Sequence, residues 1–209
     1  MNNILEIKTQ SPKHSFEALV EQARPSVVQV RSGQHGAGTG IVWKREGLIL
    51  TNNHVVAQAQ RMVKVTLTDG RELSARVLAR NPKLDLALLE TEARDLPDAV
   101  FGDSARLRVG ELVLAIGHPW GQPWVVTAGI ISALGEVEMS KNRYASYIRS
   151  DVRLAPGNSG GPLLNANAEV VGINAMIFGG DLAVAIPTHV AAAWLELAIQ
   201  PAGNELPLL

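Results

Sequence analysis

Three residues, far apart in the chain, have side chains that together could perform nucleophilic catalysis. The first, Ser159, lies in a run of small residues, PGNSGGP at 156–162. Glycine permits positive φ and close approach of a ligand to the backbone. Such a loop can expose the serine hydroxyl and direct successive backbone N–H groups to one point, as a tetrahedral oxyanion requires. A generic glycine-serine pair is more often a turn between strands, but the seven-residue run is much more specific.

A serine hydroxyl is a poor nucleophile near neutral pH and needs a base, for which histidine has a suitable pKa of about 6.5. His54 is the candidate, because it lies in LTNNHVV at 50–56, where a strand gives way to polar residues that can begin one helical turn. Taken alone, such a histidine is more often structural. The other histidines lie in a polar stretch, in a glycine-rich turn, before a proline and at the start of the last helix: His14, His35, His118 and His189.

The base needs a carboxylate that fixes its tautomer and stabilises the imidazolium that forms. Asp85 is the acid that lies between apolar residues in a strand-like run, NPKLDLALL at 81–89. A buried carboxylate demands a partner. The alternative is an aspartate at a strand start that binds backbone amides.

The elements that must position these residues are mostly strands. About a dozen short β-rich runs, separated by Gly, Pro, Asn and Asp, extend from residue 27 to about 187. With no helical patterns between them, the spacing favours antiparallel sheets closed as barrels or packed as a sandwich. A polar, turn-rich stretch at 91–108 divides them into two β-lobes. Helices are predicted at 15–24, capped by Ser15, and at 191–199.

Composition excludes several other classes of protein. The 209 residues are 46% hydrophobic and 19% charged with a formal net charge of −1, which predicts a soluble globular chain with no general attraction to nucleic acid or anionic lipid. Without cysteine there is no disulfide, thiolate zinc site or cysteine nucleophile. The histidines lack paired ligand spacing, so we expect no metal and no cofactor. No stretch reads as a membrane span or a signal peptide, which predicts a cytoplasmic chain as it stands, or a periplasmic or secreted one if a signal was trimmed.

The segments around the three residues closely resemble the HtrA/Deg branch of the chymotrypsin-fold, trypsin-like serine proteases, whose chain order is also His, Asp, Ser. The resemblance covers about residues 25–190. It implies an all-β fold, a chymotrypsin-like double antiparallel β-barrel with short N- and C-terminal helices. The motifs that carry it lie at 51–56, 85–89 and 156–164, with further matches at 38–42, 101–104, 109–111, 115–119, 129–134 and 185–187. The implied divisions are an N-terminal helix or arm at 1–24, lobes at 25–103 and 104–188, and a C-terminal helix and tail at 189–209.

The resemblance also implies a role for each residue. Ser159 attacks the substrate carbonyl, His54 takes its proton and later passes it to the leaving amine, and Asp85 orients His54. The oxyanion hole is formed around Asn158 by the backbone N–H groups of Gly157 and Ser159. An edge strand at 175–177 pairs with a bound peptide. The implied substrate-binding residues are Leu154, Ala175, Met176, Ile177, Leu182 and Val184.

The implied activity is that of a serine endopeptidase of protein quality control, acting on unfolded or misfolded proteins. The apolar pocket, which contains no acid, predicts cleavage after small or medium aliphatic residues, with Arg153 pointing outward. Asn158 stands where digestive proteases have an aspartate that orders the loop, so ordering by substrate or by neighbouring subunits, as in a homotrimer, is expected. The residues after 190 leave no room for a PDZ domain, so a protease domain alone is expected.

Two other readings compete with peptidase activity. Residues 157–161 fit the G-x-S-x-G nucleophile elbow, with Asp181 and His189 following, but an elbow runs into a helix and Gly160, Gly161 and Pro162 oppose one. The second reading is a catalytically dormant protease-like domain that binds peptides or partner proteins by its edge strand. Intact triad residues argue against dormancy, but a sequence does not reveal loop geometry.

Overall fold

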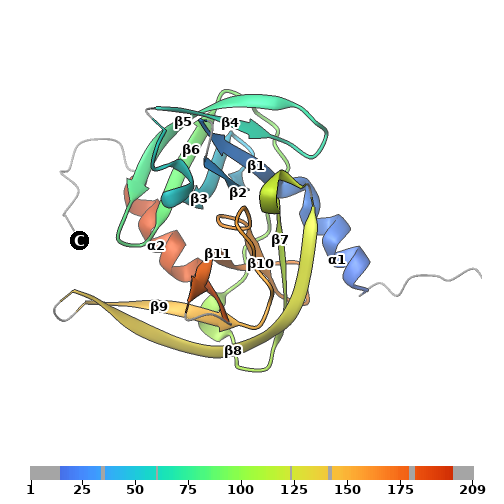
Figure 1. Cartoon of the computed structure of the whole chain (residues 1–209), viewed down its shortest axis with the longest axis vertical. Coiled ribbons are helices and arrows are strands. Elements are labelled where there is room, and N and C mark those ends of the chain that lie inside the picture. Colours follow the sequence, from blue (N-terminus) through green and yellow to red (C-terminus); the bar gives the residue numbers. More distant parts are fainter. Residues whose placement is uncertain are drawn as a thin grey trace, which may run out of the picture.

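The computed structural model describes residues 15–33, 36–59, 61–122, 124–140, 143–178 and 182–199. In these ranges twelve strands form two closed antiparallel barrels (Figure 1). The first barrel has the strand order β1-β2-β3-β6-β5-β4. Its strands are β1 Val27–Ser32, β2 Gly36–Lys44, β3 Leu48–Asn52, β4 Met62–Thr66, β5 Glu72–Asn81 and β6 Leu86–Thr91.

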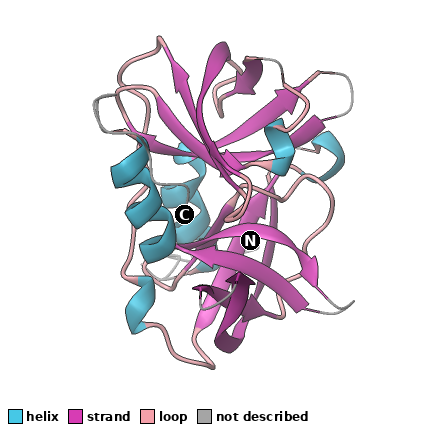
Figure 2. Cartoon of the chain, turned by 90° about the vertical axis from the view of Figure 1, so that its left-hand side faces the viewer, coloured by secondary structure: helices cyan, strands magenta, loops and turns pink. Residues whose placement is uncertain are grey.

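The second barrel has the strand order β10-β11-β12-β9-β8-β7. Its strands are β7 Leu112–Gly117, β8 Val125–Ser140, β9 Arg143–Ser150, β10 Pro162–Leu164, β11 Val170–Phe178 and β12 Leu182–Pro187. Figure 2 shows the two barrels one above the other. The all-β double-barrel prediction is therefore confirmed. The lobe boundary predicted at 103–104 lies in the segment that joins β6 to β7.

Apolar side chains form three clusters that explain why the two barrels make one body. One cluster fills the first barrel, around Val65 and Leu89, and another fills the second, around Ile131 and Leu163. A third joins the barrels and includes residues of both, such as Leu50 and Ile116, together with both helices. Burial of this apolar area fixes the barrels against each other, so side chains at their junction have defined neighbours.

Helix α1 (Phe16–Ala23) begins where the sequence predicts. The Ser15 hydroxyl accepts a hydrogen bond from the Ala18 N–H at 3.2 Å, which satisfies a free donor of the first turn. Leu19 and Ala23 pack into the cluster between the barrels. The helix then tightens into a 3-10 turn, Arg24–Ser26, that contains Pro25.

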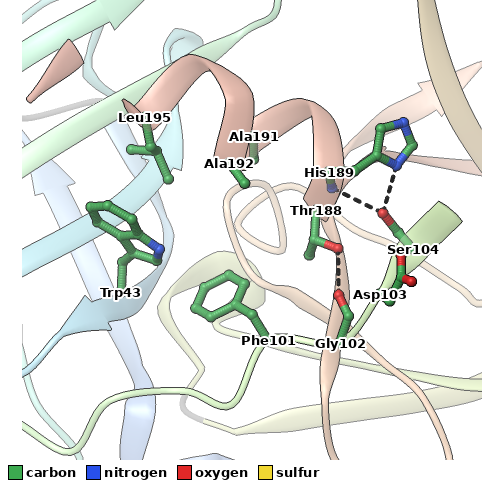
Figure 3. A pocket seen from close by; sticks show the side chains of 10 residues that line it. All are labelled: Trp43, Phe101, Gly102, Asp103, Ser104, Thr188, His189, Ala191, Ala192 and Leu195. Carbon is green, nitrogen blue, oxygen red and sulfur yellow. Dashed lines mark hydrogen bonds between the residues drawn. The ribbon is translucent and has the colours of Figure 1, made fainter. Parts of the chain in front are cut away.

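Helix α2 (Thr188–Ala198) begins three residues before the predicted start, because its cap comes from another part of the chain. Ser104 Oγ accepts from the His189 backbone N–H at 3.0 Å and lies 2.8 Å from His189 Nδ1 (Figure 3). The Thr188 hydroxyl donates to Gly102 O at 2.9 Å. Local periodicity cannot reveal a cap that lies 85 residues away in sequence.

Strands β8 and β9 are longer than the short β-rich runs that the sequence predicts, and they form the long hairpin in the lower part of Figure 1. Beyond residue 133 the two strands pair with each other, as Gly135 does with Tyr147. Leu134 and Val137 are exposed there, so this part of the hairpin does not owe its pairing to the core of the second barrel. No helix among the described residues is long and apolar enough to cross a membrane.

Some predictions lie outside the described residues. They are the arm before residue 15, the tail from residue 200, His14, His35, Asp181 and the side chains of Met176 and Ile177.

Candidate active site

His54 and Asp85 form a hydrogen-bonded pair at the edge of the first barrel. His54 begins a 3-10 turn, His54–Val56, directly after β3, as the sequence predicts. Its ring Nδ1 lies 2.7 Å from Asp85 Oδ2, and its backbone N–H donates to Asp85 Oδ1 at 2.9 Å. Because Nδ1 is bound to the carboxylate, the proton-accepting position of a neutral ring is Nε2.

Asp85 lies in the turn before β6 rather than inside the predicted strand. Its φ is +54°, a conformation that costs energy for a residue other than glycine. Two neighbours of His54 hold the backbone of this turn: the Asn53 N–H and the Asn52 side-chain amide donate to Asp85 O at 3.0 and 2.9 Å. The turn that binds His54 is therefore fixed by the residues that precede His54.

Ser159 lies in the loop between β9 and β10. The loop uses positive φ at Gly157 (+108°) and Gly160 (+85°). A Cβ atom at Gly157 would lie 2.5 Å from His118 O, so this position requires glycine for space as well as for conformation. The Asn158 N–H donates to Ala155 O at 2.9 Å, which closes a turn just before the serine.

Two backbone donors flank the Asn158 amide. Among the residues that the structure describes, neither the Gly157 N–H nor the Ser159 N–H donates a hydrogen bond. The Ser159 hydroxyl donates to Ala175 O at 2.8 Å. Two uncommitted N–H groups beside a serine are what a tetrahedral oxyanion needs.

His54, Asp85 and Ser159 line one open cavity at the junction of the barrels. The chain therefore brings together all three residues that the sequence singled out. The first barrel contributes Ala37, Asn53, His54, Pro82 and Asp85, and the second contributes Leu154, Ala155, Pro156, Gly157, Ser159 and Ala175.

The predicted substrate-binding residues differ in whether they line this cavity. Leu154 and Ala175 line this cavity, whereas Leu182 and Val184 are half-buried on β12 and are not part of the described cavity wall. Arg153 is exposed.

Strand β11 has an open side next to the serine. It pairs with β10 only from Val170 to Ile173, so residues 175–178 have β12 as their one strand partner among the described residues. The register shifts between Asn174 and Met176, which marks a bulge at Ala175.

Sequence reasoning did not identify two buried residues behind the serine loop. Thr39 Oγ1 donates to Gly157 O at 2.7 Å, and the His118 N–H donates to Thr39 Oγ1 at 3.1 Å. Burial lowers the pKa of His118 from 6.5 to about 4, so its ring is neutral at neutral pH. Thr39 lies in the GTGIV motif at 38–42, but the motif alone does not reveal what the threonine contacts.

Within the described ranges, no group of three His, Cys, Asp or Glu side chains is arranged to hold a metal ion. The groups that the cavity presents to a substrate are the serine hydroxyl, the imidazole, the carboxylate and the backbone donors.

Comparison with known proteins identifies the family of the chain. The model of the trypsin-like peptidase domain matches residues 38–173. A probable periplasmic serine endoprotease, DegP-like, of Marinomonas sp. (strain MWYL1) is 43% identical over 93% of this chain and 45% of the relative. A relative of the same description from Pseudomonas fulva (strain 12-X) is 45% identical over 81% of this chain and 39% of the relative. The chain thus spans less than half of the length of these curated relatives.

Solved structures give the same result. The HtrA-type protease AlgW with a tripeptide has a TM-score of 0.82 at 36% identity, over 89% of this chain and 64% of that one. The serine endoprotease from Yersinia pestis has a TM-score of 0.79 at 33% identity, over 88% of this chain and 66% of that one. The chain therefore belongs to the trypsin-like peptidase domain family, in its HtrA-like branch.

Proposed function

We propose that the protein is a serine endopeptidase whose triad is His54, Asp85 and Ser159. The observation that carries the proposal is the Asp85–His54 pair, with 2.7 Å between Oδ2 and Nδ1, in the same cavity as Ser159, whose own N–H and that of Gly157 have no acceptor among the described residues. This is the set of parts that acyl transfer by serine requires.

In the proposed reaction, the Ser159 hydroxyl turns from Ala175 O toward His54 and loses its proton to Nε2 as Oγ attacks the peptide carbonyl. Asp85 keeps Nδ1 protonated and stabilises the imidazolium. The Gly157 and Ser159 N–H groups donate to the oxyanion. His54 then protonates the amine as the C–N bond breaks, which leaves an acyl-enzyme. Water attacks the acyl-enzyme by the same steps, with His54 as the base, and releases Ser159.

The proposed substrates are protein segments in an extended conformation. The open side of β11 offers backbone groups to a peptide strand at 175–178, next to Ser159. An extended segment is available in an unfolded or misfolded protein, and the structural neighbour AlgW was solved with a tripeptide. Leu154 and Ala175 in the cavity wall support cleavage after small or medium aliphatic residues.

The names of the relatives support a periplasmic location for this chain. We also propose that the protein assembles as a homotrimer. Light scattering of the purified chain tests the assembly: a mass near three times 22.3 kDa is expected, and a monomer at all concentrations contradicts it.

A fluorophosphonate probe and a denatured protein substrate test the activity together. We expect labelling at Ser159 and hydrolysis, with both lost in Ser159→Ala and His54→Ala and retained in Ser74→Ala, a change at an exposed serine of β5. Cut sites identified by mass spectrometry test the aliphatic preference. A folded chain that binds peptide but neither labels nor hydrolyses would be the dormant binder and would overturn the proposal.

A further inference from the structure

Thr39 of the first barrel makes two hydrogen bonds to the loop of the second barrel that carries Ser159. Its backbone N–H donates to Ser159 O at 2.8 Å, and its hydroxyl donates to Gly157 O at 2.7 Å. The residue is fully buried on β2, and its hydroxyl bond spans 118 residues of sequence. The two carbonyl groups that it binds belong to Gly157 and Ser159, the residues whose backbone N–H groups have no acceptor in the part of the chain that the structure describes.

The serine loop also lies directly against Thr39. A Cβ atom at Gly160 would come 2.1 Å from Thr39 O, and one at Gly161 would come 3.0 Å from Thr39 Cγ2. The glycines after Ser159 are therefore needed for this close approach as well as for the turn. The methyl group of Thr39 packs on the loop while its hydroxyl binds it.

The carbonyl group of Thr39 is hydrogen-bonded to the strand that precedes His54. The Thr51 hydroxyl donates to Thr39 O at 2.7 Å, and Thr51 precedes His54 by three residues on β3. The His118 N–H donates to Thr39 Oγ1 at 3.1 Å. The Thr39 hydroxyl therefore accepts one hydrogen bond from His118 and donates its own hydrogen to Gly157 O.

We propose that Thr39 is a positioning residue for the oxyanion hole: its hydroxyl fixes the orientation of the Gly157–Asn158 peptide, and its N–H fixes the carbonyl of Ser159. The inference rests on the proposed function for its catalytic consequence, but not for its structural one. Glycine at 157 gives this peptide unusual freedom to rotate, and the bond from Thr39 Oγ1 to its carbonyl restricts that rotation together with the bond from its N–H to Ala155 O. A rotated peptide would misdirect the donors next to it.

The test compares Thr39→Val, which keeps the shape and removes the hydroxyl, with Thr39→Ser, which keeps the hydroxyl. The matched control is Thr91→Val, at a buried threonine of the same barrel whose hydroxyl accepts only from the Ala93 N–H, at 3.4 Å, among the described residues. Thr39→Ala is the second hydroxyl-free variant and replaces Thr39→Val if the latter does not fold. Circular dichroism and thermal unfolding establish folding for each variant.

The first readout is amide hydrogen exchange of residues 155–161, which does not depend on turnover. We expect exchange in the hydroxyl-free variants to be at least about tenfold faster than in the wild type, with Thr39→Ser and Thr91→Val unchanged. Exchange in the folded hydroxyl-free variants equal to that of the wild type would overturn the inference.

The second readout is the division between kcat and KM on a peptide substrate. Loss of one oxyanion donor costs about a hundredfold or more in kcat, so misdirection of the loop predicts a fall of about 10- to 100-fold in kcat with KM within about threefold. Thr39→Ser should retain at least about a third of the wild-type kcat. If Ser159→Ala is as active as the wild type, the proposed function fails, and the exchange measurement alone decides the role of Thr39.

Discussion

Asp85 holds His54 through both carboxylate oxygens, one on the ring Nδ1 at 2.7 Å and one on the backbone N–H at 2.9 Å. The same carboxylate therefore fixes the tautomer of the ring and the start of the turn that carries it. The pair is only partly shielded, with side-chain exposures of 46% for His54 and 26% for Asp85. Solvent exposure weakens the electrostatic part of the interaction, so geometry is the main contribution of Asp85.

Asp85→Asn tests this geometric role. The amide can still accept from the His54 backbone N–H, but its NH2 group then faces Nδ1 and favours the tautomer with the proton on Nε2. That ring cannot accept the serine proton, so we expect kcat to fall by about 10⁴ with little change in KM. Steady-state kinetics on a peptide substrate measures both. Asp69→Asn, at an exposed turn aspartate bound to Arg71, is the control, and a loss of less than tenfold in Asp85→Asn would contradict the assignment.

Arg80 supports the segment that follows His54. Its guanidinium, on β5, donates to the carbonyl oxygens of Val56, Ala57 and Ala59. Arg80→Met keeps much of the stem and leaves these oxygens to water, so we expect the free energy of unfolding to fall by about 1 kcal/mol and kcat/KM to fall severalfold.

Urea unfolding and peptide kinetics measure the two effects of Arg80→Met. Arg76→Met is the matched control, because Arg76 lies on the same strand and its guanidinium binds Glu90 in an exposed ion pair, which contributes little. Equal effects of the two substitutions would show that Arg80 has no special role. Arg80→Lys should restore only part of the loss, since the ammonium group lacks the planar fork by which two guanidinium nitrogens bind the three carbonyl oxygens.

The parts of the site that sequence reasoning found are those with a local signal. Ser159 stands in a run of small residues, and His54 stands where a strand ends in polar residues, so each is visible within seven residues. The strand count and the double barrel followed from strand spacing and from the family motifs. The positive φ of Asp85 was missed, because the bonds that hold it come from Asn52 and Asn53.

The parts that were missed depend on contacts across the fold. Thr39 binds a carbonyl group 118 residues away, and His118 binds Thr39 across 79 residues. A histidine before a proline gives no sign that folding will bury it. The length of the β8–β9 hairpin likewise depends on pairing between its two strands, as of Gly135 with Tyr147, and Leu134 and Val137 are exposed there.

Ser104 provides the third prediction, because it caps α2 from outside the helix (Figure 3). Pro187 at the N-cap position makes no side-chain hydrogen bond, so the first turn depends on Ser104 and on the bond from Thr188 to Gly102 O. Ser104→Ala should lower the free energy of unfolding by about 1 kcal/mol, measured by urea unfolding. Ser104→Thr, which keeps the hydroxyl, should retain most of that stability. A Ser104→Ala variant as stable as the wild type would contradict the capping role.

His118 provides the last prediction, on pH. Burial lowers the pKa of its ring in the folded protein from 6.5 to about 4. Between these values the unfolded chain binds the proton and the folded chain does not, so the free energy of unfolding must fall as the pH is lowered from 6.5 to 4. A shift of this size corresponds to about 3 kcal/mol at most. His118→Phe keeps an aromatic ring beside Trp124, 4.6 Å away between centroids, and cannot titrate.

Chemical unfolding of the wild type and His118→Phe at intervals between pH 4 and 7 isolates this contribution, because the carboxylates that also titrate there are common to both proteins. We expect the wild type to lose stability more steeply on acidification and the two curves to run parallel above pH 6.5. His118 O lies against Gly157, so protonation of the ring places a buried charge directly behind the serine loop. Parallel curves over the whole range would mean that the His118 ring is not kept neutral by the fold.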